Sequence, residues 1–119
     1  MKIRNGFVSN SSSSSFVIVS GKGAIEEALS PFSPRAKKFI AQVLNCRDVA
    51  EINGQECEVY SQTLYDDTLY ECWKYILRWE KEEGKDVEDG WEEDYVGIFD
   101  KFLDDLKKTE NVFVKRSFD

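Results

Sequence analysis

Carboxylate side chains are the most concentrated chemical groups in this sequence. Between Glu80 and Asp105 there are twelve acidic residues and three lysines, which gives a net charge of −9. Such a density of negative charge is suited to binding a basic partner. It does not by itself indicate general acid–base catalysis, which needs carboxylates that converge on one cleft. The adjacent pairs Glu92/Glu93 and Asp104/Asp105 would point about 100° apart on a helix, so neither pair converges.

Other familiar chemistries lack their residues. The chain has no His, which excludes a Ser-His-Asp triad, a Cys-His dyad and a His-ligated zinc site. Its three cysteines, Cys46, Cys57 and Cys72, form no C-x-x-C pair and predict neither a disulfide framework nor a thiolate metal site. The segment Asp86–Gly90 places its glycine one position too early for a calcium-binding EF-hand loop. Gly21–Gly23 is too short for a phosphate-binding loop. We therefore expect no catalytic residue, metal or cofactor.

Charge is unevenly distributed along the 119 residues, whose formal net charge is −7. Residues 1–47 carry seven basic and two acidic groups, a net +5, and residues 48–119 carry nine basic and 21 acidic groups, a net −12. Such asymmetry indicates either a basic partner for the acidic part or an internal match between the two parts. An acidic chain disfavours direct binding of nucleic acid.

Two sets of side chains are the candidates for contact with a protein partner. The first set consists of acidic residues on two predicted amphipathic helices, which would form a charged contact surface. The simpler interpretation is that they only keep an outward helix face solvated. These residues are Glu82, Glu83, Glu92, Glu93, Asp100 and Asp104. Tyr and Trp are favoured at interfaces. Tyr70, Tyr75 and Trp79 lie off the apolar stripe formed by Leu69, Trp73, Ile76 and Leu77, so we expect them to be available for contact.

The serine tract is the least ordinary segment. Its hydroxyl and amide groups could hold an anion, carry phosphates, or serve as a recognition or assembly tag. The simplest alternative is a solvated approach to a strand. The residues of this N-terminal motif are Arg4, Phe7, Asn10, Ser11, Ser12, Ser13, Ser14, Ser15 and Phe16.

The opening from Arg4 to Phe16, R-N-G-F-V-S-N-S-S-S-S-S-F, resembles that of many small, uncharacterised proteins of bacteriophages and their bacterial hosts. The resemblance covers about the first 20 residues. It implies a phage or prophage accessory protein, and it transfers no catalytic residue or ligand.

Hydrophobic periodicity predicts the elements that must position these groups. The Asn53-Gly54 turn predicts a hairpin, although a helix through Arg47–Ile52 competes with its first strand. The sequence Thr68–Glu71 predicts a capping box at the start of a helix. The predicted elements are a strand at Phe16–Ser20 that is buried on both faces, helices at Ala24–Leu29 and from Pro34 to Leu44, strands at Val49–Ile52 and Gln55–Tyr60, a helix from Thr68 to Glu83, a helix from Trp91 to Lys108, and a strand at Asn111–Phe118.

The predicted fold class is α+β. We expect one domain over residues 1–119, with a Ser-rich segment at 1–15 and a globular body at 16–119. About four helices would pack on a small, mainly antiparallel sheet in which the N- and C-terminal strands are neighbours.

No apolar run has the ~18–20 residues that a membrane-spanning helix needs, and no signal peptide is evident, so we expect a protein of the bacterial host cytoplasm with no membrane contact.

These features predict a small acidic accessory protein that acts by macromolecular binding. Its acidic helical surface would bind and modulate a basic or nucleic-acid-binding host protein. One version of this hypothesis is that the acidic surface imitates nucleic acid. The alternative is that the Ser-rich segment is a recognition tag on a carrier fold, and a small enzyme is the least favoured reading. Oligomeric state cannot be read from these patterns.

Overall fold

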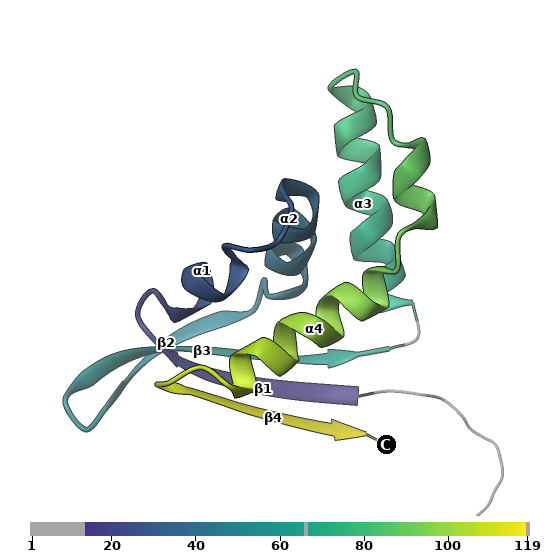
Figure 1. Ribbon diagram of the computed structural model, residues 1–119. Coiled ribbons are helices and arrows are strands. Elements are labelled where there is room, and N and C mark those ends of the chain that lie inside the picture. The colour runs from purple at the N-terminus through teal and green to yellow at the C-terminus, as the bar shows by residue number, and fades with distance from the viewer. Residues whose placement is uncertain (1–13, 66, 119) are drawn as a thin grey trace, which may run out of the picture.

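The computed structural model describes residues 14–65 and 67–118, which form one layer of helices on one antiparallel sheet (Figure 1). In chain order the elements are β1 (Ser14–Gly21), α1 (Ala24–Leu29), α2 (Pro34–Val43), β2 (Arg47–Ile52), β3 (Gln55–Leu64), α3 (Thr68–Glu82), the short 3-10 helix η1 (Glu88–Glu92), α4 (Tyr95–Lys107) and β4 (Val112–Phe118). The predicted α+β class is confirmed.

The four strands are ordered β2-β3-β1-β4, and every neighbouring pair is antiparallel. The two terminal strands are hydrogen-bonded neighbours, as predicted, with Val19 of β1 level with Phe113 of β4. On the other side of β1, Val19 is level with Val59 of β3. The strand nearest the N-terminus is therefore interior to the sheet, and β2 and β4 form its edges.

Local sequence signals explain most element boundaries. Asn53 and Gly54 both have positive φ, 53° and 78°, which is the backbone of a type I′ hairpin turn between β2 and β3. The Ser33 hydroxyl accepts a hydrogen bond from the Ala36 amide at 3.2 Å, and Pro34 occupies the first helical position of α2. The hairpin is thus confirmed, and the competing helix is not formed.

The predicted capping box of α3 is wrong. Thr68 is the first residue inside the helix, and its hydroxyl accepts a hydrogen bond from the Tyr65 amide at 2.9 Å. The Glu71 carboxylate forms a salt bridge with Lys74 instead of reaching back to the helix start. The hydroxyl is used to close the preceding turn, so it is not available to cap the helix.

The core lies between the sheet and the helices. Phe16 and Ile18 of β1 point toward the helices, and Phe16 meets Phe99 of α4 edge-on, with ring centroids 5.8 Å apart. Phe39 of α2 makes a similar contact with Trp73 of α3 at 5.1 Å. The apolar stripes predicted for α2 and α3 are buried as expected.

The predicted burial of β1 and the predicted start of α4 are wrong. β1 is buried on one face only, because all the helices lie on the same side of the sheet, and Val17 remains partly exposed on the other side (Figure 1). Trp91 belongs to η1 and is exposed, so α4 begins later than predicted, at Tyr95. Asp94 ends the intervening turn by accepting a hydrogen bond from the Gly97 amide at 2.9 Å.

Ser20 yields a stability prediction. Its hydroxyl is fully buried in β1 and has no hydrogen-bond partner among the described residues. A buried polar group without a partner costs stability, so Ser20→Ala should raise the free energy of unfolding by about 1 kcal/mol. Urea denaturation followed by circular dichroism measures this change, with Ser61→Ala on the exposed side of β3 as the control. A loss of stability in Ser20→Ala would contradict the prediction.

Candidate functional site

The acidic segment folds into the end of α3, the helix η1 and the start of α4. α3 ends in a Schellman motif, in which the Gly84 amide donates to the Lys81 carbonyl and the Lys85 amide donates to the Glu80 carbonyl. Gly84 has a φ of 86°, a conformation that favours glycine. The chain then turns back so that η1 lies beside α3 (Figure 1).

Arg35 of α2 holds three residues of this acidic segment. Its guanidinium lies 3.0 Å from Glu80, 3.0 Å from Glu93 and 3.4 Å from Asp89. Glu80 is only 5% exposed, and both of its carboxylate oxygens accept hydrogen bonds from Arg35. The hydrogen bonds to Glu80 are the main reason that the pKa of Arg35 is raised. Part of the acidic segment is therefore neutralised within the chain.

Gly90 allows η1 to approach α3 and Arg35 closely. A Cβ atom at this position would lie 2.3 Å from Cδ2 of Leu77 and 3.0 Å from Nη1 of Arg35. The Gly90 carbonyl accepts a hydrogen bond from Nε1 of Trp73 at 2.8 Å, which satisfies the polar atom of this buried side chain. The acidic turn is consequently fixed against α3.

The six acidic residues predicted for contact do not form one continuous surface. Glu93 is exposed but pairs with Arg35 at 3.0 Å, and Asp100 pairs with Arg116 of β4 at 2.7 Å. Glu83 lies 3.6 Å from Lys85. The remaining three are exposed and make no salt bridge with any described residue; they are Glu82, Glu92 and Asp104.

The three aromatic side chains predicted for contact are all exposed. Tyr75 is the most accessible, at 52%. Trp79 lies under the ammonium group of Lys38 from α2, 4.0 Å from the ring centroid. Tyr70 contacts Tyr95 of α4, with centroids 6.4 Å apart. Trp79 and Tyr70 thus also serve contacts within the chain.

The exposed side of α3 carries a basic stripe that was not predicted. Its members are Lys74, Arg78, Lys81 and Lys85, which together with Trp91 line a groove of about 370 Å³ between α3 and η1. Spacings of 4 and 3 put Lys74, Arg78 and Lys81 on one face of α3, a pattern that the sequence already contains, and Lys85 follows the end of the helix. The net negative charge of the segment hides this stripe, because the acids outnumber the basic residues. The outer surface of α3 is therefore mixed in charge.

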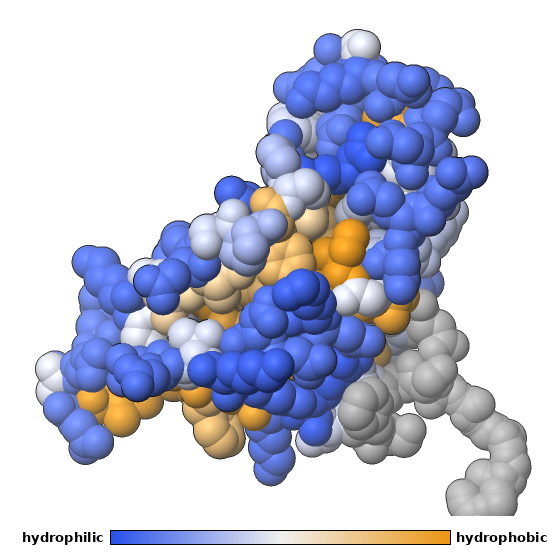
Figure 2. Space-filling model, in the orientation of Figure 1, coloured by the Kyte–Doolittle hydropathy of each residue, from blue (hydrophilic) through white to orange (hydrophobic). Residues whose placement is uncertain are grey.

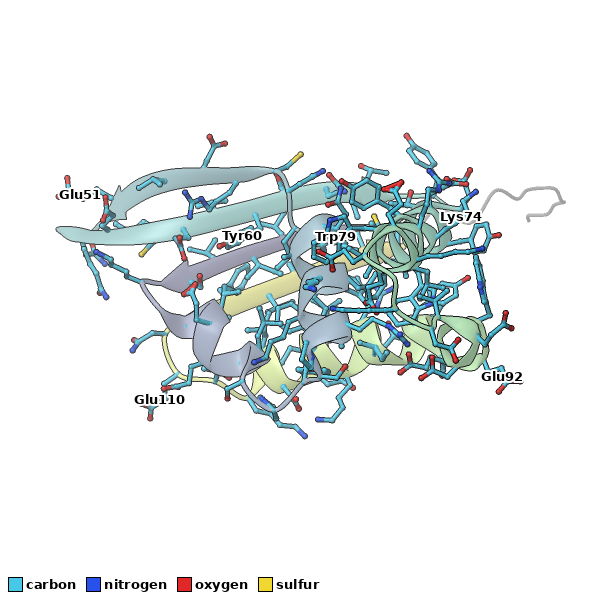
Figure 3. All side chains as sticks on the ribbon, turned by 90° about the horizontal axis from the view of Figure 1, so that it is seen from above. Glu51, Tyr60, Lys74, Trp79, Glu92 and Glu110 are labelled. Carbon is cyan, nitrogen blue, oxygen red and sulfur yellow. The ribbon has the colours of Figure 1, made fainter. Side chains whose placement is uncertain are left out.

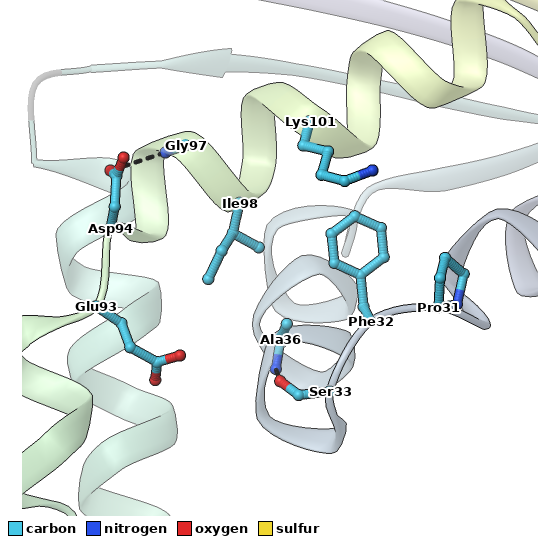
Figure 4. A pocket seen from close by; sticks show the side chains of 9 residues that line it. All are labelled: Pro31, Phe32, Ser33, Ala36, Glu93, Asp94, Gly97, Ile98 and Lys101. Carbon is cyan, nitrogen blue, oxygen red and sulfur yellow. Dashed lines mark hydrogen bonds between the residues drawn. The ribbon is translucent and has the colours of Figure 1, made fainter.

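A cleft of about 570 Å³ opens between the α1–α2 loop and the start of α4 (Figure 4). Phe32 and Ile98 supply apolar surface, and the carboxylates of Glu93 and Asp94 lie at one end. At the other end the ammonium group of Lys101 lies 5.6 Å from the Phe32 ring centroid and forms a salt bridge with Asp105 at 2.8 Å. This cleft, here called the α2–α4 cleft, is the candidate functional site because it joins apolar and acidic groups.

Besides Arg35, two titratable groups among the described residues have a shifted pKa. Burial raises the pKa of the Cys72 thiol, and burial together with Glu58 raises the pKa of the Tyr60 hydroxyl. Both shifts favour the neutral, unreactive form. The described residues hold no group of three or more metal-ligating side chains, and no helix among them is both long enough and apolar enough to cross a membrane.

The N-terminal motif lies mostly outside the described residues, which exclude its members from Arg4 to Ser13. Its last three residues belong to the sheet: Ser14 and Ser15 pair with β3 and β4, and Phe16 is buried in the core. The sheet therefore begins two residues before the predicted start of the globular body.

Comparison with protein-family models, with curated proteins and with solved structures finds no significant match to this chain.

The contact between Arg35 and Glu80 yields a second stability prediction. Arg35→Met leaves a buried carboxylate without its partner and should lower the free energy of unfolding by about 3–5 kcal/mol. The double variant Arg35→Met/Glu80→Met should recover most of the loss, because an apolar pair of similar volume can replace a buried ion pair. Asp89→Asn removes only an exposed partner and should cost under about 1 kcal/mol. Urea denaturation measures the free energy of unfolding of all three variants. A double variant whose loss equals the sum of the losses of its two single variants would contradict this interpretation.

Proposed function

We propose that this protein acts by binding a basic segment of another protein in the α2–α4 cleft. The observation that carries the proposal is the combination of groups there: Phe32 and Ile98 offer apolar surface next to the carboxylates of Glu93 and Asp94. A segment with an apolar side chain beside a lysine or arginine fits both features. Apolar contact would supply affinity, and the carboxylates would orient the cation.

Unpaired acids extend the negative field around this cleft. Glu92 is exposed next to Glu93 and makes no salt bridge with a described residue. Clustered charge of one sign raises the rate at which an oppositely charged partner is encountered. The intrachain pairing of Glu93 and Asp100 leaves fewer free carboxylates than imitation of a nucleic-acid backbone would use. We therefore favour docking of a short basic segment.

Nucleic-acid-binding proteins carry clustered lysines and arginines, which makes them the class of partner that we propose. The phage-like opening of the sequence supports a bacterial host protein as the source. In this proposal the acidic protein occupies a basic surface of the host protein and so modulates its activity.

Charge reversal and loss of apolar contact test the proposal separately. Glu92→Lys and Ile98→Ser should each weaken binding of a partner captured from a bacterial lysate by about tenfold, because the first reverses a charge of the negative field beside the cleft and the second removes apolar lining. Glu92 is chosen because its reversal breaks no salt bridge with a described residue. Isothermal titration with the purified partner measures the affinity, and circular dichroism checks that each variant is folded.

The matched controls are Glu51→Lys and Glu110→Lys. These acids are exposed and lie at the end of the molecule opposite to Glu92 (Figure 3). Their reversal changes the net charge by the same amount and should alter the affinity by less than about twofold. Equal weakening by Glu92→Lys and the controls would indicate a nonspecific charge effect and would refute the α2–α4 cleft as the site.

A further inference from the structure

One face of the sheet is left uncovered by the described residues. All the helices lie on the opposite side (Figure 1), and Figure 2 shows hydrophobic side chains gathered beneath the strands. Phe113 of β4 is 58% exposed, and Val17 of β1 and Ile52 of β2 are exposed with it. Alternation along the strands puts Val19 and Val59 on this same open face, level with Phe113. An apolar cluster of this kind on a protein surface marks an interaction site.

The open face is electrically balanced, although the protein as a whole is acidic. By strand alternation its charged residues among those described are Asp48 on β2 and Lys115 on β4. Both are exposed, and neither makes a salt bridge with a described residue. They stand on opposite edge strands, about 14 Å apart at a strand spacing of about 4.8 Å, so they do not pair within one molecule.

These charges select a second copy of the chain as the partner. Rotation by 180° about an axis parallel to the strands places β2 of each copy over β4 of the other. Asp48 then faces the neighbourhood of Lys115 twice, once on each side of the axis. The two residues differ by two positions along the strands, about 7 Å, which the length and freedom of a lysine side chain can cover. An axis across the strands would instead bring β2 over β2 and Asp48 toward its own copy.

The open face also offers a recess for an aromatic side chain. A hollow of about 370 Å³ is lined by Val19, Gly21, Ile52 and Cys57 and is bordered by Phe113. In the arrangement with β2 over β4, the Phe113 ring of one copy lies level with Asp48 of the other, about two residues or 7 Å along the strands from this hollow. The acidic segment and the α2–α4 cleft belong to the helical layer, so they stay on the outer sides of such a pair.

We propose that the open face of the sheet is the interface of a symmetric dimer, in which two sheets pack face to face with β2 over β4. Aligned packing of two sheets is an established way to bury an apolar sheet face. Four strands of about seven residues give a footprint of roughly 450 Å² per copy, about 900 Å² in total, which is below the roughly 1,200–2,000 Å² of stable interfaces and makes this a weak, reversible dimer.

A charge exchange between Asp48 and Lys115 tests the dimer and its orientation together. Asp48→Lys and Lys115→Asp should each raise the dimer dissociation constant by about tenfold, since each places like charges opposite one another. The double variant should return to within about threefold of the original value. Recovery cannot arise within one molecule because the two residues are three strands apart. Sedimentation equilibrium of the full chain over about 1–500 μM measures each dissociation constant.

Two further variants separate the interface from a general effect on the surface. Phe113→Asp should abolish the dimer, and Val96→Lys, at another exposed apolar residue, on α4, should leave it unchanged. Circular dichroism confirms folding.

Failure of the double variant to recover overturns the strand-parallel orientation. A full chain that stays monomeric throughout overturns the proposal and makes residues 1–13, which lead into β1, the next occupant to test. Either result leaves the proposed α2–α4 cleft unaffected.

Discussion

The buried contact between Arg35 and Glu80 is the interaction on which the arrangement of the helical layer depends. A carboxylate in that position is tolerated only because a guanidinium meets both of its oxygens. The same guanidinium reaches Asp89 and Glu93, so one side chain joins α2, α3 and the turn before α4. These helices carry the α2–α4 cleft, whose shape therefore follows from a contact between residues 45 positions apart in the chain.

This contact also changes the meaning of the uneven charge. Arg35 and Arg47, from the basic part of the chain, pair with Glu80 and Glu58 of the acidic part. Asp100 is likewise paired, with Arg116. The internal match between the two parts thus exists, and it accounts for a share of the carboxylates. A smaller set of acids is left without a salt bridge to a described residue, which makes a local docking site a better hypothesis than a uniformly acidic surface.

The single-sided sheet divides the molecule into two surfaces of different character. The helical layer presents charge, exposed aromatic rings and the α2–α4 cleft. The open face presents a flat apolar cluster with one charge on each edge. A layer architecture with one uncovered sheet face leaves apolar surface in water, so the two surfaces fit different partners. Binding at one need not obstruct binding at the other, because they face in opposite directions.

Patterns with a short range were readable from the sequence alone. Ser33-Pro34, Asn53-Gly54 and Gly84 mark boundaries that the structure has, because caps and turns depend on neighbouring residues. Helical periodicity likewise identified the buried side of α2 and α3, and the pairing of the terminal strands followed from their need for hydrogen-bond partners. The basic stripe on α3 was equally readable, but counting charge by segment hid it.

Tertiary structure decided the rest. Whether Glu93 pairs with Arg35, and whether Val17 is covered, depends on which elements pack together, and no local pattern carries that information. The hydroxyl of Thr68 shows the same limit at short range, since a competing hydrogen bond to Tyr65 determined its role. Residue types therefore determined the elements and their apolar faces, whereas packing determined which charges are neutralised and which surfaces stay open, because both depend on partners distant in the chain.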